Sequence, residues 1–473
     1  MQFEKLEGVE FFVSKSDRHK IYAEYLVENE DGRTPGVRKF VDIDSPDFAS
    51  FLRLIAIPKM HDPMSVSEII RYVRDYCRVY GNRDTITANV RIAGKLADGL
   101  VEYSLYNEEQ EYVQITPNGW TITKDPSHKF IETENAYPQC KPKKSSKKLP
   151  SLFKKYVNAK KCFVIILLVW LIQSFCEGNH SALLIMAQRG SGKSTLTKQL
   201  RQIIDPSKLD ATTKNNKTEN LLTALTNSYV VAFDNVCDLT KADSNALCVA
   251  ITGGTYSKRE LYTTNQLAIF KLHNTVIING INIIPTESDF AERSLLVQLK
   301  KIDETTRIND DDISKNFNDD LPYILGGIFD VISEAMTIVK TLKPTRKPRM
   351  AESYTEMLAI AMALGIDEKV FEDVYFDNIH LIDKARSNTD LVFAVREFME
   401  KCVKGRSFEG SVSEVYAKVR ANYSGNKSAL PRSASAFSQK VKADYSSFLA
   451  AGYVVNVDDT RPEGTYIKLI RKK

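Results

Sequence analysis

Two apolar runs near the middle of the chain form the strongest hydrophobic pattern in the sequence. Residues Cys162–Phe175 are almost continuously apolar. Because this run is shorter than the roughly 18–20 residues of a membrane span, it predicts a buried helix. Leu183–Met186 form a second apolar run that ends in small residues, and Leu196 and Leu200 then recur at helical spacing. This second pattern predicts a strand, a turn and a helix in that order.

The turn after Leu183–Met186 reads Gly-Ser-Gly-Lys-Ser-Thr and has the composition of a phosphate-binding P-loop. Its backbone N–H groups can surround an anion at a helix N-terminus, where the helix dipole adds positive charge. Lys193 would reach the β- and γ-phosphates of a nucleotide, and the Ser194 hydroxyl would bind Mg²⁺. The other residues of the predicted nucleotide-binding loop are Gln188, Arg189, Gly190, Ser191, Gly192 and Thr195.

Ala187 stands where the P-loop pattern has its first glycine. An alanine costs little there if the backbone stays strand-like, and more if φ must be positive. The alternative interpretation is a chance glycine-rich turn. The strand before the turn, the helix after it and the Lys-Ser-Thr sequence favour a nucleotide site.

Two further predicted buried strands carry polar residues at their ends. Tyr229–Phe233 leads to Asp234, whose carboxylate is suited to the Mg²⁺ shell. Thr275–Gly280 carries Asn279, which can sense the γ-phosphate and align the attacking water. Asn235 stands where many ATPases have a water-activating glutamate, and its amide can orient water but cannot accept a proton at neutral pH. Hydrolysis would then depend on Asp234 or on a residue that the sequence does not identify.

Basic residues accompany this predicted core. Two β-prone runs around a Thr-Asn-Gln turn predict a hairpin over 256–270. Lys258 and Arg259 would lie near its base or along one strand, either as DNA contacts or as ordinary surface charges. Arg293 precedes a further strand and suits the phosphate charge of a transition state. The alternative for Arg293 is a structural ion pair with Glu292 or another neighbour.

Residues 1–136 predict a mixed α/β domain that serves as an interaction or nucleic-acid-binding module. His61 and Asp62 are adjacent polar residues for which a loop position is favoured over a metal site. The expected helices of this domain are Phe48–Ile57 and Ser65–Tyr80, and the expected strands are Val9–Val13, Ile21–Val27, Val90–Ala93, Glu102–Tyr106, Tyr112–Ile115 and Trp120–Ile122.

The next boundaries follow changes in composition along the chain. Lysine, proline and serine predict a basic linker over 137–149, for which a solvated tether is favoured over a contact with phosphates. The α/β core with the P-loop would span 150–310. A helical lid over a nucleotide would follow at 311–388, where two prolines break the helical pattern.

Residues 389–473 predict three helices followed by two strands, which is the order of a winged helix. Its last part, 427–473, carries nine Lys or Arg and four Asp or Glu residues, a net charge of +5. Lys440 and Lys442 would lie on a DNA-contacting helix, and the alternative is a winged helix that binds protein. The third helix would begin at Pro431 and turn these side chains inward: Phe437, Val441, Tyr445 and Phe448. The strands would be Tyr453–Val457 and Thr465–Ile470.

Composition narrows the class of protein further. The chain has 473 residues, enough for roughly two to four domains, and 43% of them are hydrophobic. The net charge of +5 and a pI of about 8.6 permit a polyanionic partner without proving one. The seven cysteines contain no C-x-x-C pair and indicate cytosolic thiols, not a disulfide framework or a zinc site. No signal peptide or membrane span is expected, so the predicted location is the cytoplasm.

In the order of its motifs the chain resembles the AAA+ helicases of phages and mobile genetic elements, which are related to superfamily-3 and MCM helicases. The replication proteins of staphylococcal pathogenicity islands and cassette elements belong to that group. The resemblance extends from about Lys148 to the C-terminus. It is carried by the P-loop, Asp234-Asn235, the Thr-Gly-Gly…Ser-Lys-Arg-Glu-Leu-Tyr-Thr stretch, Asn279-Gly280-Ile281, Ala291–Ser294 and Lys347–Ala351.

The resemblance implies a homo-hexameric ring of AAA+ cores that hydrolyses ATP with Mg²⁺ between subunits. Single-stranded DNA would pass through its pore, and duplex DNA would meet the winged helix. Arg293 would be the finger that reaches a neighbour's site, Arg349 a lid sensor arginine at the nucleotide, and the 256–270 hairpin the pore element. Ala187 and Asn235 depart from the family's pattern.

The leading hypothesis is therefore an ATP-driven DNA helicase, with recognition of a replication origin as a further role. One alternative is an ATP-dependent loader or remodeller of protein complexes. Another is a DNA-binding initiator whose ATP site serves only assembly.

Overall fold

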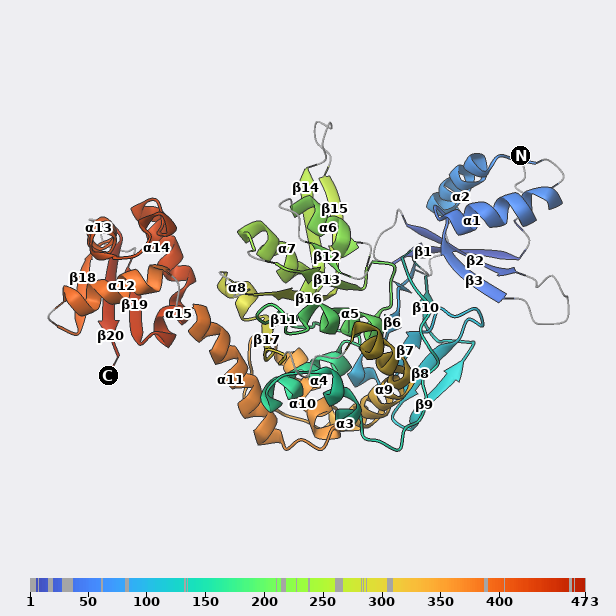
Figure 1. Ribbon diagram of the computed structural model, residues 1–473. Coiled ribbons are helices and arrows are strands. Elements are labelled where there is room, and N and C mark those ends of the chain that lie inside the picture. The colour runs from blue at the N-terminus through green and yellow to red at the C-terminus, as the bar shows by residue number, and fades with distance from the viewer. Residues whose placement is uncertain are drawn as a thin grey trace.

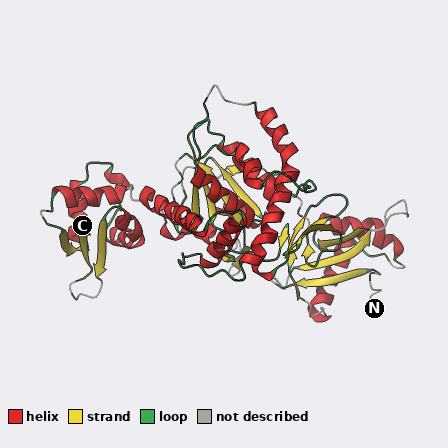
Figure 2. Cartoon of the chain, turned by 90° about the horizontal axis from the view of Figure 1, so that it is seen from below, coloured by secondary structure: helices red, strands yellow, loops and turns green. Residues whose placement is uncertain are grey.

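The computed structural model consists of three bodies that lie side by side (Figure 1). A large central body lies between a smaller N-terminal body and a smaller C-terminal body, and Figure 2 shows the same order from below. The described residues are all except 1–5, 7, 16–19, 28–36, 61–62, 81–84, 132, 134, 210, 214–217, 227, 237–238, 260–266, 282, 284, 286, 304–308, 387–389, 404, 459–461, 463 and 473.

A five-stranded, fully parallel sheet forms the centre of the large body. Its strand order is β12-β13-β16-β11-β17. Parallel sheets are buried on both faces, so their strands are continuous apolar runs, and the three such runs that the sequence predicts as strands are confirmed. The strands are β11 (Ala182–Met186), β12 (Thr212–Thr213), β13 (Val230–Asp234), β16 (Thr275–Gly280) and β17 (Ser294–Gln298).

Alternate side chains of these strands pack into two separate cores. Leu183 and Ile185 pack with the helices of one face, whereas Ala182 and Leu184 pack with those of the other. The first face is covered by α4 (Lys161–Gln173) and α5 (Lys193–Ile204), and the second by α6 (Thr218–Thr226), α7 (Lys241–Thr252) and the short α8 (Ser288–Ala291). Helix α4 is buried along most of its length, which confirms that the apolar run at Cys162–Phe175 is a core helix.

The predicted hairpin is present as β14 (Gly254–Arg259) and β15 (Leu267–Leu272), which pair antiparallel outside the main sheet. Lys258 and Arg259 lie along β14, where Arg259 pairs with Leu267. Their side chains, and the residues between the two strands, lie outside the part of the chain that the structure describes.

Three helices follow β17 and confirm the helical prediction for 311–388, including its break near the two prolines. They are α9 (Asp310–Ile338), α10 (Ala351–Ala363) and α11 (Glu368–Arg386). Helix α9 is long and apolar enough to cross a membrane by length and composition, but 61% of that apolar window is buried inside the protein. It packs against α10 and is a helix of the core.

Helix α11 covers the outer edge of the parallel sheet. The Asn378 side chain donates from Nδ2 to the Leu296 carbonyl at 2.7 Å and accepts from the Leu296 N–H at 2.9 Å. An open strand edge presents unpaired backbone groups. Asn378 satisfies both groups of Leu296 and thereby joins α11 to β17.

A second, antiparallel sheet packs against α9 and belongs to the central body. Its apolar residues between Ile92 and Ile115 share one core with α4 and α9, whereas Leu6–Cys77 form a separate core. The packing therefore divides the chain between Cys77 and Ile92, whereas the sequence predicts a boundary at residue 136. This sheet contains β6 (Ile92–Ala93), β7 (Val101–Ser104), β8 (Tyr112–Thr116) and β9 (Gly119–Thr123), and β5 (Ala88–Asn89) pairs separately with β10 (Lys129–Phe130).

The predicted basic linker is packed against the core and is not a solvated tether. The Lys143 N–H donates to the Pro322 carbonyl of α9 at 2.8 Å. A Cβ atom at Gly326 would lie 2.0 Å from the Lys143 carbonyl oxygen, so only glycine permits this close approach. Lys144 pairs with Asp330 at 2.9 Å and lies over the Trp120 ring. The segment leads into the short helix α3 (Leu149–Phe153).

The N-terminal body confirms the predicted strands and helices before residue 81. Its sheet has the order β3-β2-β1-β4, and one face packs on the two helices. The sequence did not predict β3, whose run is interrupted by Arg38 and Lys39. His61 and Asp62 lie outside the described residues. The elements are β1 (Val9–Ser14), β2 (Ile21–Val27), β3 (Val37–Asp42), β4 (Thr85–Ile86), α1 (Pro46–Phe51), which continues as a π-helical turn over Leu52–Ala56, and α2 (Val66–Tyr80).

In the C-terminal body the predicted strand pair is confirmed, but the helix before it is wrong in two respects. It begins after Ser433, whose hydroxyl accepts from the Ala436 N–H at 3.2 Å, because serine is a favoured N-cap and Pro431 lies outside the helix. It is also interrupted at Asp444, so Tyr445 is 43% exposed and does not face inward.

The C-terminal sheet also contains a strand that the sequence did not predict, giving the order β18-β20-β19. The elements are α12 (Asp390–Lys401), β18 (Ser407–Ser411), α13 (Val412–Asn422), α14 (Ala434–Ala443), α15 (Tyr445–Ala450), β19 (Tyr453–Asp458) and β20 (Tyr466–Arg471).

A buried arginine joins the second sheet to the parallel sheet. The Arg91 side chain is fully buried and pairs with Asp205 at 3.1 Å. Its guanidinium also donates to the carbonyls of Ser104, Tyr137 and Pro206 at 2.8–3.2 Å. These groups come from three separate stretches of the chain, so this one side chain holds them together.

We expect Arg91→Met to lower the free energy of unfolding of the central body by about 3–5 kcal/mol, because Asp205 would keep a buried, unpaired charge. Both tryptophans, Trp120 and Trp170, lie in this body, so urea unfolding followed by their fluorescence measures the effect. Lys141→Met is the matched control. Lys141 pairs with Glu111 at 2.8 Å on the surface, where water screens the pair, so its loss should cost far less than the loss of Arg91. Equal losses in the two variants would contradict the assignment.

Candidate functional site

The carboxyl ends of the parallel strands meet at one edge of the sheet. In open parallel sheets this edge, where neighbouring connections diverge, is where ligands bind. Strand β11 lies between β16 and β17, and the predicted P-loop leaves its end. Asp234 and Gly280 end the strands that follow on one side. The fold therefore brings the predicted loop and the predicted carboxylate to the same edge.

The loop after β11 turns sharply at its glycines. Gly190 and Gly192 both have a φ of 74°, the left-handed region that favours glycine, and Gly192 caps the N-terminus of α5. Ala187 is not among the residues of positive φ. It is buried in the core, and its N–H donates to the Gly280 carbonyl at 3.1 Å. The backbone at Ala187 is therefore one that alanine adopts at little cost, which removes the difficulty raised by the missing glycine.

The first turn of α5 places a hydroxyl directly against the carboxylate at the end of β13. The Ser194 Oγ donates to both Asp234 oxygens, at 3.0 and 3.2 Å. Lys193 is 7% exposed at the start of the same helix. A hydroxyl beside a carboxylate is a pair of oxygen ligands of the kind that Mg²⁺ prefers, and a buried lysine beside them suits a phosphate group. These residues fit a nucleotide with its metal ion.

Asn279 is fully buried, and its side chain is occupied by bonds inside the protein. Its Nδ2 donates to the Thr197 Oγ1 at 2.8 Å, and its Oδ1 accepts from the Asn235 N–H at 3.1 Å. Thr197 in turn donates to the Lys193 carbonyl at 2.9 Å. The amide links β16 to α5 and to the end of β13. In this structure it is a positioning residue, and its predicted contact with a γ-phosphate stays a prediction.

Asn235 lies at the strand end with an exposed side chain and a positive φ of 54°. Asparagine tolerates this left-handed conformation better than most residues. The backbone bond to Asn279 holds it, so the turn directs the chain away from the sheet after Asp234. Gln188 and Arg189 are exposed at the outer side of the predicted loop.

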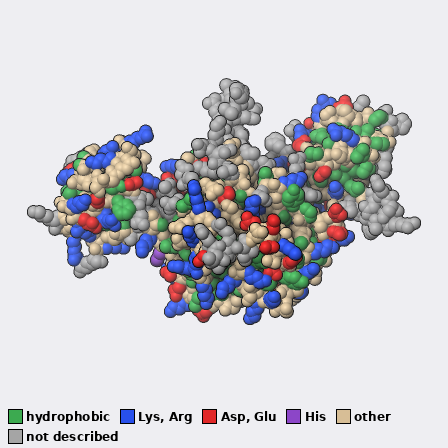
Figure 3. Space-filling model, in the orientation of Figure 1, with side chains coloured by type: hydrophobic (Ala, Val, Ile, Leu, Met, Phe, Trp, Pro, Cys, Tyr) green, Lys and Arg blue, Asp and Glu red, His purple; other side chains and the backbone are tan. Residues whose placement is uncertain are grey.

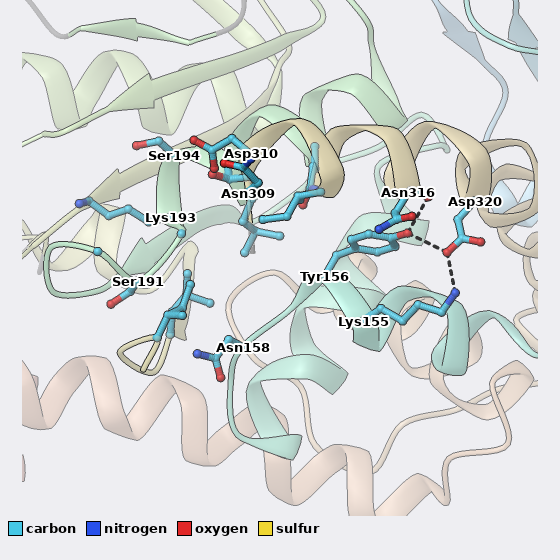
Figure 4. A pocket seen from close by; sticks show the side chains of 18 of the residues that line it. Lys155, Tyr156, Asn158, Ser191, Lys193, Ser194, Asn309, Asp310, Asn316 and Asp320 are labelled. Carbon is cyan, nitrogen blue, oxygen red and sulfur yellow. Dashed lines mark hydrogen bonds and ion pairs between the residues drawn. The ribbon is translucent and has the colours of Figure 1, made fainter. Parts of the chain in front are cut away.

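A cavity of about 920 Å³ adjoins the loop and extends away from the sheet edge (Figure 4). Residues 190–195 form one wall, as the sequence predicts. Two other walls were missed: the stretch from Lys155 to Asn158 and the first turns of α9, from Asn309 to Asp320. No local motif marks these residues, and only the packing of α9 against the start of α4 brings them to the loop.

Two bonds to one carboxylate brace the wall opposite the loop. Figure 4 shows Lys155 and Tyr156 reaching Asp320 on α9, each at 2.7 Å. Burial and the neighbouring Asp320 raise the pKa of the Tyr156 hydroxyl. Burial would raise the pKa of Asp320, but the bonds from Lys155 and Tyr156 hold it below its ordinary value. The stretch before α4 is thereby fixed to α9.

Arg293 and Arg349 lie together at the opposite edge of the sheet. Ser294 pairs with Ala182 at the start of β11, so Arg293 lies at the amino end of the strands. Arg293 pairs with Asp289, while Arg349 pairs with Asp289 and, at 2.7 Å, with Glu292. Neither arginine is among the described residues that line the cavity. The predicted role of Arg349 at a nucleotide stays a prediction, and it would need a site other than the cavity of the same chain.

The charged groups of this arginine cluster shift one another's pKa values. Burial would raise the pKa of Asp289, but the bond from Arg293 and the charge of Arg349 hold it below its ordinary value. The hydrogen bond to Glu292 raises the pKa of Arg349. In this structure the two arginines are thus neutralised by acidic residues on and beside α8.

The residues predicted to contact DNA lie at two separate places. Lys258 and Arg259 are on β14 of the central body, and Lys440 and Lys442 are on α14 of the C-terminal body. Lys440 pairs with Glu287 of the central body and with Asp444, both at 3.6 Å. Lys442 is exposed. Figure 3 shows charges of both signs interspersed over one face of the molecule.

Comparison with known proteins finds a family model that matches the central part of the chain. Residues 151–368 match the family model described as actinomycete integrative conjugative element replication protein. This segment contains the loop, the cavity walls and both arginines. The central part of the chain is therefore similar to replication proteins of mobile elements. No curated protein matches the chain.

Solved structures of the NrS-1 C-terminal region also align with the chain. An A form apo structure aligns over 99% of this chain and 97% of that chain, with 12% identity and a TM-score of 0.39. A second apo structure aligns over the same shares with 11% identity and a TM-score of 0.39. At these TM-scores the likeness carries no argument about fold or function.

We expect Asn279→Ala to lower the free energy of unfolding of the nucleotide-free protein by about 1–3 kcal/mol, because the buried Thr197 hydroxyl and the partly buried Asn235 N–H each lose a partner. Urea unfolding without nucleotide measures this. Thr197→Val removes the hydroxyl that accepts from Asn279. The double variant should therefore lose less free energy of unfolding than the sum of the losses in the two single variants. An unchanged stability for Asn279→Ala would indicate that the residue acts only on a bound ligand.

Proposed function

We propose that the protein is an ATP-driven DNA helicase of a phage or mobile genetic element that works as a homo-hexameric ring. The observation that carries the proposal is the convergence of Ser194 with Asp234 beneath a glycine turn, at the carboxyl edge of a parallel sheet. The match of residues 151–368 to a replication-protein family supports a role in the replication of a mobile element. The central body would be an AAA+ core, and α9–α11 its helical lid.

In this proposal the loop residues would bind ATP with Mg²⁺, and transfer of the γ-phosphoryl group of ATP to water, with release of ADP and phosphate, would drive the motor. Lys193 holds the phosphates, and Ser194 and Asp234 hold the metal ion. The cavity has a volume in the range of about 300–1,000 Å³ that suits a small ligand, and the apolar side chains among its mostly polar lining are suited to a base. Ile302 and Ile313 belong to these walls.

In the proposal, the residues at the end of β13 activate the attacking water. Asn235 has an exposed amide there, which orients water but does not remove its proton. Asp234 is the nearest carboxylate in the sequence. Asn279 contributes by holding the Asn235 backbone and, through Thr197, the first turns of α5.

The arginine cluster supports a site that is shared between subunits. Arg293 and Arg349 lie at the edge of the sheet opposite Lys193, so their own chain cannot bring them to its own loop without unfolding. In a closed ring every heterologous interface is the same, and each subunit can present this edge to the loop of its neighbour. Both arginines would then act on the neighbour's nucleotide.

The C-terminal body supports duplex binding. Its order of one helix, one strand, three helices and a closing strand pair is consistent with a winged helix, and 427–473 carry a net charge of +5. The β14–β15 hairpin would contact single-stranded DNA in the ring pore. The proposed location is the cytoplasm, where both ATP and DNA are present.

We expect Lys193→Ala to reduce steady-state ATP hydrolysis by about 10²–10³-fold and to abolish strand displacement on a forked duplex, because a preorganised positive charge is lost. Lys208→Ala is the matched control, since Lys208 is an exposed lysine of the same body outside the cavity lining. Hydrolysis within a few-fold of the parent would remove the nucleotide assignment. Hydrolysis by the parent without strand displacement would favour an initiator that uses ATP only for assembly.

We expect mixtures of Arg293→Ala and Lys193→Ala to recover part of the ATP turnover that neither variant shows alone. Mixed rings contain some interfaces in which an intact Lys193 faces an intact Arg293, and an arginine finger contributes roughly 10³–10⁵ in rate. Phosphate release as a function of mixing ratio measures the recovery. If nothing is recovered although both variants assemble and exchange subunits, Arg293 acts within its own chain or is structural.

A further inference from the structure

Among the described residues, two contacts join the C-terminal body to the central body. Helix α15 packs against α11, and Asn378 joins α11 to β17 of the parallel sheet. The second attachment is the ion pair between Lys440 on α14 and Glu287 in front of α8. Figure 1 shows α8 at the side of the central body that faces the C-terminal body.

The Lys440–Glu287 pair is partly shielded from water. The Lys440 side chain is 33% exposed and that of Glu287 is 24% exposed. Lys440 also pairs with the buried Asp444, where α14 is interrupted. Its ammonium therefore lies between two carboxylates and points toward the central body. Lys442 is two residues further on, and residues at this spacing lie on different sides of a helix.

This arrangement conflicts with the role expected for the helix. If α14 contacts duplex DNA, its lysines must meet phosphates, and Lys440 cannot meet a phosphate while it is bound to Glu287. Glu287 also caps α8, since its carbonyl accepts from the Ala291 N–H at 3.1 Å. The same short helix carries Asp289, which neutralises both Arg293 and Arg349.

We propose that Glu287 and Lys440 form a latch that holds the C-terminal body in a closed position, in which a DNA phosphate must compete with Glu287 for Lys440. The inference rests on the proposed binding of duplex DNA by the C-terminal body. Opening the latch frees Lys440 for DNA and leaves the Glu287 carboxylate, in front of α8, without this partner. Because coupling between two binding events is reciprocal, DNA at α14 and the partners of the arginine cluster then influence one another.

The test measures the affinity of the full-length chain for a fluorescein-labelled duplex of mixed sequence, by anisotropy, with all variants compared at the same salt concentration and then over a series of salt concentrations. Glu287→Gln should bind about 2- to 5-fold more tightly than the parent, which is the effect expected from losing one partly exposed ion pair. Lys440→Gln should bind more weakly, with a flatter dependence of log affinity on log salt. In the Lys440→Gln background, Glu287→Gln should have no further effect, because Glu287 acts only through Lys440.

Glu334→Gln is the matched control. Glu334 is an exposed glutamate on α9, and its replacement changes the net charge by the same amount without touching the latch. Equal tightening by Glu334→Gln and Glu287→Gln would overturn the latch, as would an effect of Glu287→Gln that persists without Lys440. If the parent binds duplex DNA and Glu287→Gln does not change the affinity, the latch alone fails. If the parent binds no duplex DNA, the DNA partner of the proposed function fails with it.

Discussion

The amide of Asn279 is the interaction on which the geometry of the candidate site depends. It lies at the end of β16, binds the hydroxyl of Thr197 on α5, and binds the backbone directly after Asp234. A buried amide without partners is costly, so α5, β13 and β16 cannot move independently at this edge. The link also helps to place Ser194 beside Asp234, because Ser194 is on the same helix as Thr197 and Asp234 directly precedes Asn235, and Asn279 binds both Thr197 and Asn235.

The central body presents two chemically different edges. The carboxyl edge of the sheet has a glycine turn, a buried lysine and a cavity, while the amino edge has two arginines held by carboxylates. Parallel strands separate these edges by the full length of a strand, so one chain cannot combine them. The proposed ring would bring these unlike edges of neighbouring chains together. The acidic residues on and beside α8 pair with both arginines within the same chain.

Several elements were predictable because their signal is local. The strands of the parallel sheet are short apolar runs, since both faces of the sheet are buried. The turn at Gly190 and Gly192 is specified by residues that are close together in the chain. Elsewhere the local signal misled. The apolar spacing from Phe437 to Phe448 predicts one helix, but the helix is interrupted at Asp444, and Tyr445 then faces outward. Strand β18 pairs with β20 across a long separation and has little apolar character of its own, which is why the sequence did not reveal it.

The sequence by itself determined the loop, the strand ends that carry Asp234 and Asn279, and the helical character of the region after β17. These follow from periodicity and from residues adjacent in the chain. Only the tertiary structure decided that Asn279 points into the protein, that Arg349 joins Arg293 and not the loop, and that Tyr156 closes the cavity against α9. It also decided that Lys440 meets Glu287. Hydrophobic patterning specifies which faces are buried, but the partner of a polar group depends on which distant elements pack together, and no local pattern encodes that choice.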